Sequence, residues 1–219
     1  MRIGIIGAGN IGQALAKLAV GAGHEVMLSN SRGPESLAET AAEIGCAAGT
    51  AAQAAEFGEI VVVTVPLKNV TQIDPAPLAG KTVIDTNNYY PNRDGRIADL
   101  DELRTTTSSM VAAHFSRSHV VKAFNAILAA DLPKSAGSLG LPGRRALPIA
   151  GDDAASKAAV ADLHAQFGFD VVDAGRLEES WRFERAKPAY CIPLVRDDLR
   201  AALAKAERDV ELPHGSWWR

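Results

Sequence analysis

Three glycines near the amino terminus are the first residues along the chain whose type and spacing could serve a chemical function. Gly7, Gly9 and Gly12 stand in "GAGNIG", which has the spacing GxGxxG. An apolar run precedes them and a helical pattern over residues 10–22 follows. In that context Gly7 permits a tight turn, Gly9 leaves room for a pyrophosphate, and Gly12 lets the helix approach the sheet. The segment therefore predicts a dinucleotide site, whose pyrophosphate we expect at the turn residues Gly7, Ala8, Gly9, Asn10, Ile11 and Gly12.

The end of the next predicted strand indicates which dinucleotide binds. An NAD site usually has an acidic residue here to accept hydrogen bonds from the ribose. This chain instead has Asn30, Ser31 and Arg32. A hydroxyl and a planar guanidinium suit a 2'-phosphate, which a carboxylate would repel. We therefore expect NADP rather than NAD; the alternative is that Arg32 is an exposed turn residue.

The ends of later strands supply amides, hydroxyls and rings but no nucleophile with a base. Such a set fits hydride transfer, which depends on proximity and orientation more than on acid–base groups of the protein. Tyr89 and Tyr90 either donate a proton or line a loop, and Lys122 is expected at the surface. The catalytic residue stays unassigned, with Asn88, Tyr89 and Asn125 as candidates. The residues expected near the nicotinamide are Val65, Pro66, Asn69 and Ala126.

These candidates must be positioned by a sheet, and strands and helices alternate along the chain as in an α/β fold. The pattern predicts a Rossmann-type doubly wound parallel sheet with a small C-terminal α/β extension. We expect an NADP-binding domain over residues 1–125 and a smaller acceptor-site or dimerisation region over residues 126–219. Predicted strands cover residues 2–7, 24–30, 59–66, 81–87, 119–125, 146–151 and 169–175; predicted helices cover 10–22, 33–45, 50–58, 152–168 and 194–210; polar or Gly/Pro-rich loops cover 88–97 and 132–145.

The composition excludes several classes of protein. A formal net charge of -3 does not suit a general nucleic-acid surface, and no apolar run is long enough for a membrane helix. The two cysteines and five histidines lack metal-ligand spacing, so no metal site and a cytoplasmic location are expected. We expect Arg144 and Arg145 on a solvated loop. The tail with Trp217 and Trp218 is either exposed or docked on a partner.

Several motifs together resemble one family, the F420-dependent NADP oxidoreductases. They are the amino-terminal glycine segment, the "SR" after the second strand, "VVVTVP", "VVKAFNAI", "IAGDDAASKAAVADL" and "FDVVDAGRLEESW". The "KAFN" motif is also similar to the reductase domain of STEAP-type metalloreductases, which pass hydride from NADPH to a flavin. The resemblance implies a homodimer in which a deazaflavin faces the nicotinamide. It also implies a pyrophosphate site at residues 8–11, a 2'-phosphate site at Ser31 and Arg32, and a nicotinamide neighbourhood that includes Val65, Asn69 and Ala126.

Two segments depart from the family pattern: "WRFERAKPAYCIP" after "LEES", and the loop "DTNNYYPNRDGRI". Both are expected to border the acceptor. Arg182, Glu184 and Arg185 either form a pocket for a polar acceptor or a solvated face. Three functions are therefore weighed: a reductase of deazaflavin F420, FMN or FAD; a reductase of a small imine or carbonyl compound; and a non-catalytic NADP(H) sensor.

Overall fold

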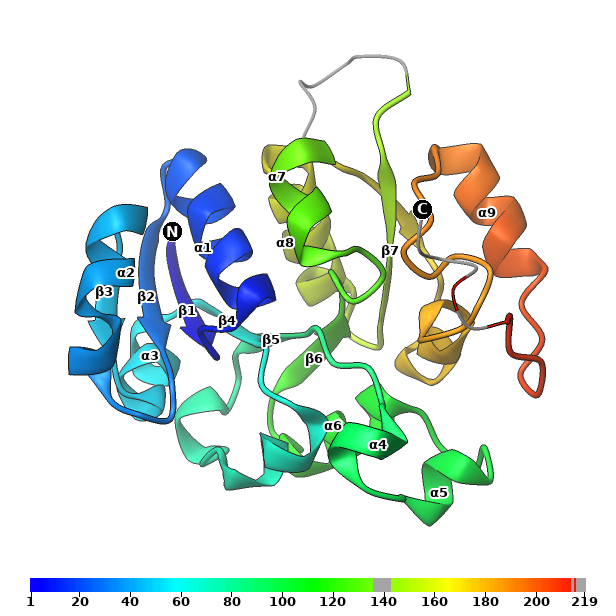
Figure 1. Cartoon of the computed structure of the whole chain (residues 1–219), viewed down its shortest axis with the longest axis horizontal. Helices are drawn as coiled ribbons and strands as arrows, with labels where there is room; N and C mark the ends of the chain where they lie inside the picture. The colour runs from blue at the N-terminus through cyan, green and yellow to red at the C-terminus, as the bar shows by residue number, and fades with distance from the viewer. Residues whose placement is uncertain (136–142, 214, 216–219) are drawn as a thin grey trace.

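The computed structural model describes residues 1–135, 143–213 and 215, and its centre is a single eight-stranded sheet. The strand order is β3-β2-β1-β4-β5-β6-β7-β8. The first six strands pair in parallel, β7 runs antiparallel to β6, and β8 runs parallel to β7. Helices lie along both sides of the sheet (Figure 1). The α/β fold expected from the sequence is confirmed.

The strands are short, and seven of the eight were expected from the sequence patterns. They are β1 (Arg2–Ile6), β2 (Glu25–Ser29), β3 (Ala47–Gly49), β4 (Ile60–Val63), β5 (Thr82–Asp85), β6 (His119–Lys122), β7 (Ala146–Gly151) and β8 (Asp170–Asp173). Strand β3 was not expected.

The helices are mostly short as well. The α-helices are α1 (Asn10–Gly21), α2 (Ala38–Ile44), α3 (Ala51–Phe57), α4 (Pro91–Asp94), α5 (Ala98–Asp101), α6 (Thr107–His114), α7 (Leu132–Ser135), α8 (Ala154–Gln166) and α9 (Arg196–Ala204). The 3₁₀ helices are η1 (Pro34–Leu37), η2 (Leu67–Gln72), η3 (Ala76–Leu78), η4 (Ala129–Asp131) and η5 (Leu177–Phe183).

Strand β4 shows how the sheet separates two apolar cores. Ile60 and Val62 join the cluster beneath α1, α2 and α8, whereas Val61 and Val63 join the cluster beneath α3, η2 and α6. Successive side chains of a strand point to opposite faces, so an unbroken apolar run is what a strand covered on both faces requires. The sequence pattern and the packing therefore agree.

A third apolar cluster lies in the carboxy-terminal part of the chain. It joins β7 to α9 and to the segment after η5, with Phe183 and Tyr190 among its members. Because β6 pairs with β7, the sheet continues past residue 125 without interruption. The division into domains at residues 1–125 and 126–219 stays a prediction.

Three expected elements differ in extent from the sequence prediction. The helix expected over residues 33–45 begins as η1 and becomes α-helical only at Ala38, ending before the left-handed Gly45. The helix expected over residues 194–210 ends at Ala204, because Lys187 Nζ binds the carbonyl oxygens of Glu207, Arg208 and Val210 and holds that stretch as a loop. The expected polar loop 88–97 contains the one-turn helix α4.

The expectation of a solvated Arg144–Arg145 loop is wrong, because both residues are buried. The guanidinium of Arg144 donates to the carbonyl oxygens of Ala165, Gly168 and Phe169, at the end of α8. Arg145 reaches Ser135 and lies 3.5 Å from a carboxylate oxygen of Asp131. These partners come from distant parts of the sequence, so the local pattern gave no sign of them.

Of the loop expected over residues 132–145, the first four residues form α7, and residues 136–142 fall outside the described residues, as does the tail with Trp217 and Trp218. Within the described part of the chain, no helix has the length and apolar character needed to cross a membrane.

Candidate active site

The turn between β1 and α1 is tightly packed, with one open position. Gly7 has φ +117°, and Thr64 Oγ1 donates to its carbonyl oxygen at 2.7 Å. A Cβ on Gly12 would lie 1.9 Å from that same oxygen, whereas a Cβ on Gly9 would meet no protein atom within 4 Å. The protein itself therefore requires glycine at 7 and 12, while Gly9 leaves space that faces outward from the turn.

A cavity of about 460 Å³ extends from this turn to the end of β2; we call it the nucleotide cavity. It brings together nine of the predicted binding residues: Gly7, Ala8, Gly9, Asn30, Ser31, Arg32, Val65, Pro66 and Asn69. Ala51, Thr64, Gln72, Ile73 and Ile6 complete its lining. Of the other predicted turn residues, Asn10 begins α1, Gly12 is buried and Ile11 lines a neighbouring cavity.

The loop after β2 is organised by Asn30. Its Oδ1 accepts a hydrogen bond from the Arg32 amide at 2.9 Å, and its Nδ2 donates to Ser36 at 2.9 Å. Asn30 therefore shapes the turn that carries Ser31 and Arg32. Both of those residues are exposed, and among the described residues the Arg32 guanidinium has no hydrogen bond or ion pair. A cation left in this state at a cavity rim is suited to an anionic ligand.

A second cavity, of about 370 Å³, shares Gly9, Thr64, Val65 and Pro66 with the nucleotide cavity; we call it the acceptor cavity. It lies at the carboxyl ends of β4, β5 and β6, where ligands of such sheets bind. Its further lining residues are Ile11, Thr86, Asn87, Asn88, Tyr90, Arg93, Phe124, Asn125, Ile127, Leu128, Ala129 and Tyr190.

Two of the three catalytic candidates meet in the acceptor cavity, and the third does not. Asn88 and Asn125 both line it. The Tyr89 hydroxyl instead contacts the Gly95 carbonyl and Asp101, and Tyr89 lines a different cavity. Ala126, expected near the nicotinamide, is buried in the third apolar cluster.

Asn88 and Asn125 hold one another in a fixed orientation. Asn88 Nδ2 donates to the Asn125 carbonyl, so its Oδ1 is left to accept from Asn125 Nδ2 at 3.1 Å. Asn125 Nδ2 also donates to the Phe183 carbonyl at 2.9 Å. The Oδ1 of Asn125 has no partner among the described residues. A buried amide oxygen without a partner is a candidate acceptor for a ligand donor.

The residue before Asn125 has a strained backbone. Phe124 has φ +56° and is almost fully buried, and its ring stacks on His164 at 3.9 Å between centroids. Burial lowers the pKa of His164 to about 4, so the ring is neutral near pH 7. Backbone strain of this kind costs about 1–3 kcal/mol and persists where packing enforces it, often at functional sites.

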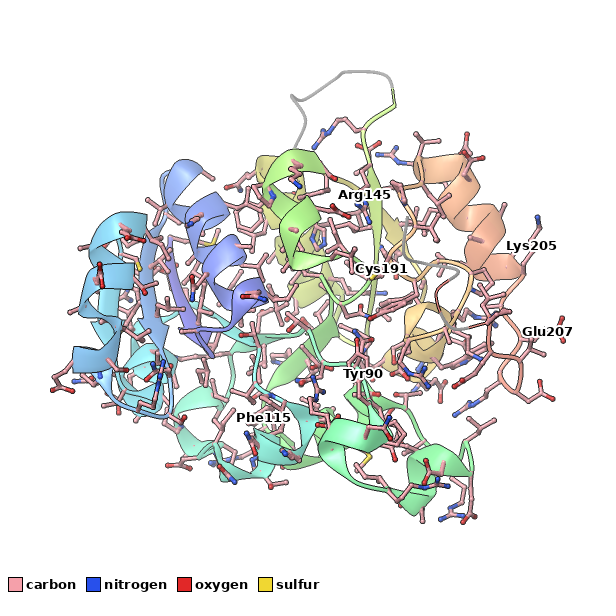
Figure 2. The ribbon with its side chains drawn as sticks, viewed as in Figure 1. Tyr90, Phe115, Arg145, Cys191, Lys205 and Glu207 are labelled. Atoms are coloured by element: carbon pink, nitrogen blue, oxygen red, sulfur yellow. The ribbon has the colours of Figure 1, made fainter. Side chains whose placement is uncertain are left out.

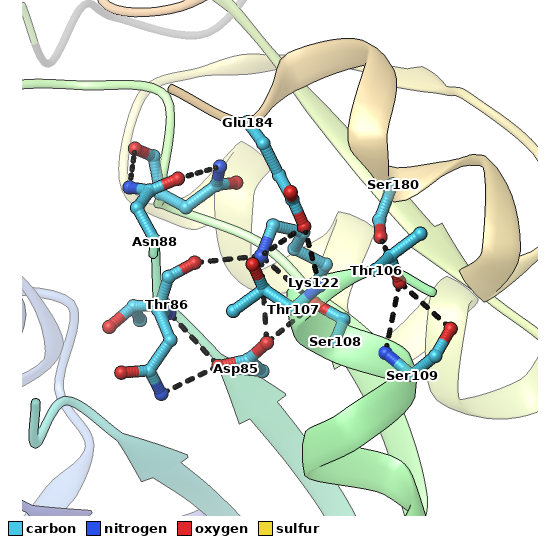
Figure 3. A network of polar contacts seen from close by, with 12 residues as sticks. Asp85, Thr86, Asn88, Thr106, Thr107, Ser108, Ser109, Lys122, Ser180 and Glu184 are labelled. Atoms are coloured by element: carbon cyan, nitrogen blue, oxygen red, sulfur yellow. Dashed lines mark hydrogen bonds and ion pairs between the residues drawn. The ribbon is translucent and has the colours of Figure 1, made fainter. Parts of the chain in front are cut away.

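Lys122 was expected at the surface, and this is wrong: its side chain is fully buried, within the network of polar contacts drawn in Figure 3. Its Nζ donates to the Asn87 carbonyl at 2.7 Å and to Ser108 Oγ at 2.9 Å, and lies 3.6 Å from carboxylates of Asp85 and Glu184. The ammonium therefore ties the ends of β5 and β6 to α6 and to the segment after η5.

The remaining groups of this buried cluster are also paired. Asp85 accepts hydrogen bonds from the Asn87 amide and from Ser108 Oγ, and Glu184 accepts one from the Thr107 amide. Thr106 caps α6 by accepting from the Ser109 amide, and Ser180 donates to Thr106 (Figure 3). The cluster thereby holds Asn87, which lines the acceptor cavity.

Tyr190 and Arg93 are lining residues that the sequence reasoning missed. The hydroxyls of Tyr90 and Tyr190 lie 2.6 Å apart, although 100 residues separate them in sequence. In Figure 2 Tyr90 lies below Cys191, the neighbour of Tyr190. The sequence signal for them was that the segments "DTNNYYPNRDGRI", which contains Arg93, and "WRFERAKPAYCIP", which contains Tyr190, depart from the family pattern.

The charged residues of that segment have mixed surroundings. Glu184 and Arg185 line a third cavity of about 270 Å³ together with Trp181. Arg182 binds Glu179 and lies over the Trp181 ring. Glu184 is mostly buried, so it is not part of a simple solvated face. In the described part of the chain, no group of three or more His, Cys, Asp or Glu residues is arranged to hold a metal ion.

The comparisons with known proteins agree with the resemblance expected from the motifs. Residues 2–89 match the family model described as NADP oxidoreductase coenzyme F420-dependent. The chain is 28% identical over 202 residues to metalloreductase STEAP3 of Rattus norvegicus. That alignment covers 89% of this chain but only 38% of the relative, so the chain spans well under half of that protein.

Solved structures show the same arrangement. A hypothetical protein, SMa0349, of Sinorhizobium meliloti is 29% identical, with a TM-score of 0.76 over 90% of this chain and 96% of the other. A putative F420-dependent NADP-reductase of Arthrobacter sp. FB24 is 26% identical, with a TM-score of 0.68 over 80% of this chain and 85% of the other. An imine reductase of Streptomyces aurantiacus, 20% identical with a TM-score of 0.58 over 81% of this chain and 56% of the other, shares the fold.

Proposed function

We propose that this chain, whose residues 2–89 match the F420-dependent NADP oxidoreductases, transfers hydride between NADP(H) and a deazaflavin (F420) or flavin (FMN or FAD) acceptor. One observation carries the proposal. The nucleotide cavity and the acceptor cavity share Gly9, Thr64, Val65 and Pro66, so a ligand that starts at Arg32 and follows the glycine turn enters the acceptor cavity.

The proposed nucleotide contacts follow from the local chemistry. The space at Gly9 and the amino terminus of α1 suit a pyrophosphate, since amide N–H groups and the helix dipole favour an anion there. The hydroxyl of Ser31 and the exposed guanidinium of Arg32 suit a 2'-phosphate. Val65, Pro66 and Asn69 border the path between the two ends.

In the acceptor cavity the chain's own groups orient a ring and exclude water. Asn125 Oδ1 is the proposed acceptor for a carboxamide N–H, held in place by Asn88. Phe124, Ile127 and Leu128 supply apolar walls. Bound NADPH supplies the hydride, and the protein contributes positioning. Residues 126–219 contribute Tyr190 to this cavity, in line with the proposed acceptor-site role of that region; a homodimer and a cytoplasmic location belong to the same proposal.

A second candidate is a reductase of a small imine or carbonyl compound. The Tyr90–Tyr190 hydroxyl pair in the acceptor cavity favours it, because such a substrate needs a proton as well as a hydride. The third candidate function is a non-catalytic NADP(H) sensor, which would bind the dinucleotide without oxidising or reducing it.

Anaerobic oxidation of NADPH, followed by absorbance with F420, FMN, FAD and a cyclic imine as separate acceptors, tests the proposal. Turnover with F420 or a flavin supports it. Turnover with the imine alone selects the second candidate. Tight NADPH binding without turnover of any acceptor would leave the sensor reading, and absence of NADPH binding would reject all three.

A further inference from the structure

Two tyrosine hydroxyls meet in the wall of the acceptor cavity. Their oxygens lie 2.6 Å apart, the length of a short O–H···O hydrogen bond. Tyr90 stands immediately before α4 and Tyr190 follows η5, and both line the cavity. The contact is formed only because the fold brings these two segments together.

The two rings are held differently. Tyr190 is 5% exposed and packs in the third apolar cluster, and the amide of the next residue, Cys191, donates to the Ala126 carbonyl. Burial is the main reason that the pKa of Tyr190 is raised, so this phenol keeps its proton. Tyr90 is only partly buried, and the Arg93 guanidinium lies 4.7 Å from its ring centroid. Arg93 is itself anchored on the Asn88 carbonyl.

We propose that Tyr90 donates the proton that completes reduction of the acceptor, and that Tyr190 is a positioning residue that stabilises the Tyr90 oxygen. The inference rests on the proposed function and narrows it to acceptors that take up a hydride and a proton. The acceptor must therefore present a ring nitrogen, or the heteroatom of a carbonyl or imine group, within reach of the Tyr90 hydroxyl.

The proton balance follows from the geometry. With Tyr190 donating to Tyr90, the Tyr90 O–H is available to the acceptor atom that gains electron density when hydride arrives from NADPH. The O–H bond of Tyr90 breaks and a bond from hydrogen to that atom forms. The phenolate left on Tyr90 accepts the Tyr190 hydrogen bond beside Arg93, and solvent returns the proton because Tyr90 is partly exposed. NADPH is oxidised, and the acceptor gains one hydride and one proton.

An equilibrium measurement tests the pair without any acceptor. The chain contains three tyrosines, so a Tyr89→Phe background leaves only Tyr90 and Tyr190. Ultraviolet absorbance titration should give a lower first tyrosine pKa in Tyr89→Phe than in Tyr89→Phe/Tyr190→Phe. The two pKa values should differ by about 1 to 2 pH units, which is the effect of one hydrogen bond to a charged oxygen. Equal values in the two variants would show that Tyr190 does not stabilise the Tyr90 phenolate, and would overturn its proposed role.

A kinetic measurement tests proton donation itself. The probes are 5-deazariboflavin, which needs hydride and proton, and its N1-alkylated cation, which needs hydride alone. Tyr90→Phe should lower kcat with the neutral probe about 100-fold, within the usual worth of a general acid, and change kcat with the cation little. NADPH binding and the circular dichroism spectrum should be unchanged.

Tyr89→Phe is the matched control, since Tyr89 adjoins Tyr90 in sequence but lines another cavity. It should reduce both probes at the wild-type rate. Equal losses with both probes in Tyr90→Phe, or no loss with either, would reject the proton-donor role. Failure of the wild-type protein to oxidise NADPH with either probe would count against the proposed function. The titration would still show whether Tyr190 stabilises the Tyr90 phenolate.

Discussion

The two cavities of this molecule are built in different ways. The residues that line the nucleotide cavity all fall between Ile6 and Ile73, at the end of β1 and on the segments that follow β1, β2, β3 and β4. The acceptor cavity draws on residues from Gly9 to Tyr190. The first is thus a product of consecutive strand-to-helix turns, and the second requires the whole sheet and the segment after η5. The difference explains why the first could be read from short motifs.

Their polar groups differ as well. At the nucleotide cavity, Arg32 is exposed and without a partner in the described part of the chain. Next to Asn87 of the acceptor cavity, Lys122 and Asp85 are fully buried and paired with several groups. An exposed cation is available to a ligand at little cost in stability, whereas a buried ion is part of the framework. Substitution of Arg32 should therefore affect ligand binding, whereas substitution of Lys122 should affect folding.

The largest expected effect is at Lys122. Lys122→Met leaves the Asp85 carboxylate buried without its cation and frees the Asn87 carbonyl. The free energy of unfolding should fall by about 3–5 kcal/mol in urea denaturation. Lys205→Met, at an exposed position, is the control and should change it by less than about 0.5 kcal/mol. Similar small losses in both variants would contradict a structural role for the buried ion pair.

The next effect is a loss of stability in acid. Burial lowers the folded-state pKa of His164 to about 4, below the usual 6.5 of a histidine, so between these pH values the unfolded chain binds the proton more strongly. Stability should thus be complete above about pH 6.5 and fall toward pH 4, by roughly 3 kcal/mol from this group. Urea unfolding at several pH values measures it. A His164→Leu variant should lose this part of the slope; an unchanged slope would show that other groups cause it.

Arg32→Ala tests the same comparison at the nucleotide cavity, where ligand binding rather than stability should change. The loss of a charged donor to a 2'-phosphate should weaken NADPH binding about 10- to 100-fold and leave NADH binding nearly unchanged. Fluorescence titration with both nucleotides measures this difference. Arg117→Ala removes an exposed arginine just before β6, at the amino ends of the strands, and serves as the control. Equal losses for NADPH and NADH would argue against a 2'-phosphate contact.

Gly9→Ala should separate binding from folding within one turn. The new methyl group meets no protein atom, so stability should be retained, but it occupies the space proposed for the pyrophosphate. NADPH binding should weaken by about 1–3 kcal/mol if the clash resembles overpacking. Gly21→Ala, which also meets nothing within 4 Å, is the matched control and should bind normally. Unimpaired binding by Gly9→Ala would mean that no ligand lies against this turn.

The sequence was informative where a feature depends on neighbours along the chain. The alternation of strand and helix patterns predicted an α/β sheet, and the glycine spacing predicted a tight turn before α1; both are present. Failures occurred where the decisive neighbours are distant. Arg144 and Lys122 look like surface cations in their local segments, yet each is buried on partners more than 13 residues away.

The sequence by itself determined the α/β fold, the glycine turn and the placement of Ser31 and Arg32 at a strand end, because periodicity and turn chemistry act over a few residues. Only the tertiary structure decided that Tyr90 meets Tyr190, that Tyr89 lies elsewhere, and that Asn125 is oriented by Asn88. Those contacts require that segments far apart in sequence converge at the carboxyl edge of the sheet. Whether a polar side chain is buried, and which groups it binds, depends on these long-range contacts, so no local sequence pattern encodes it.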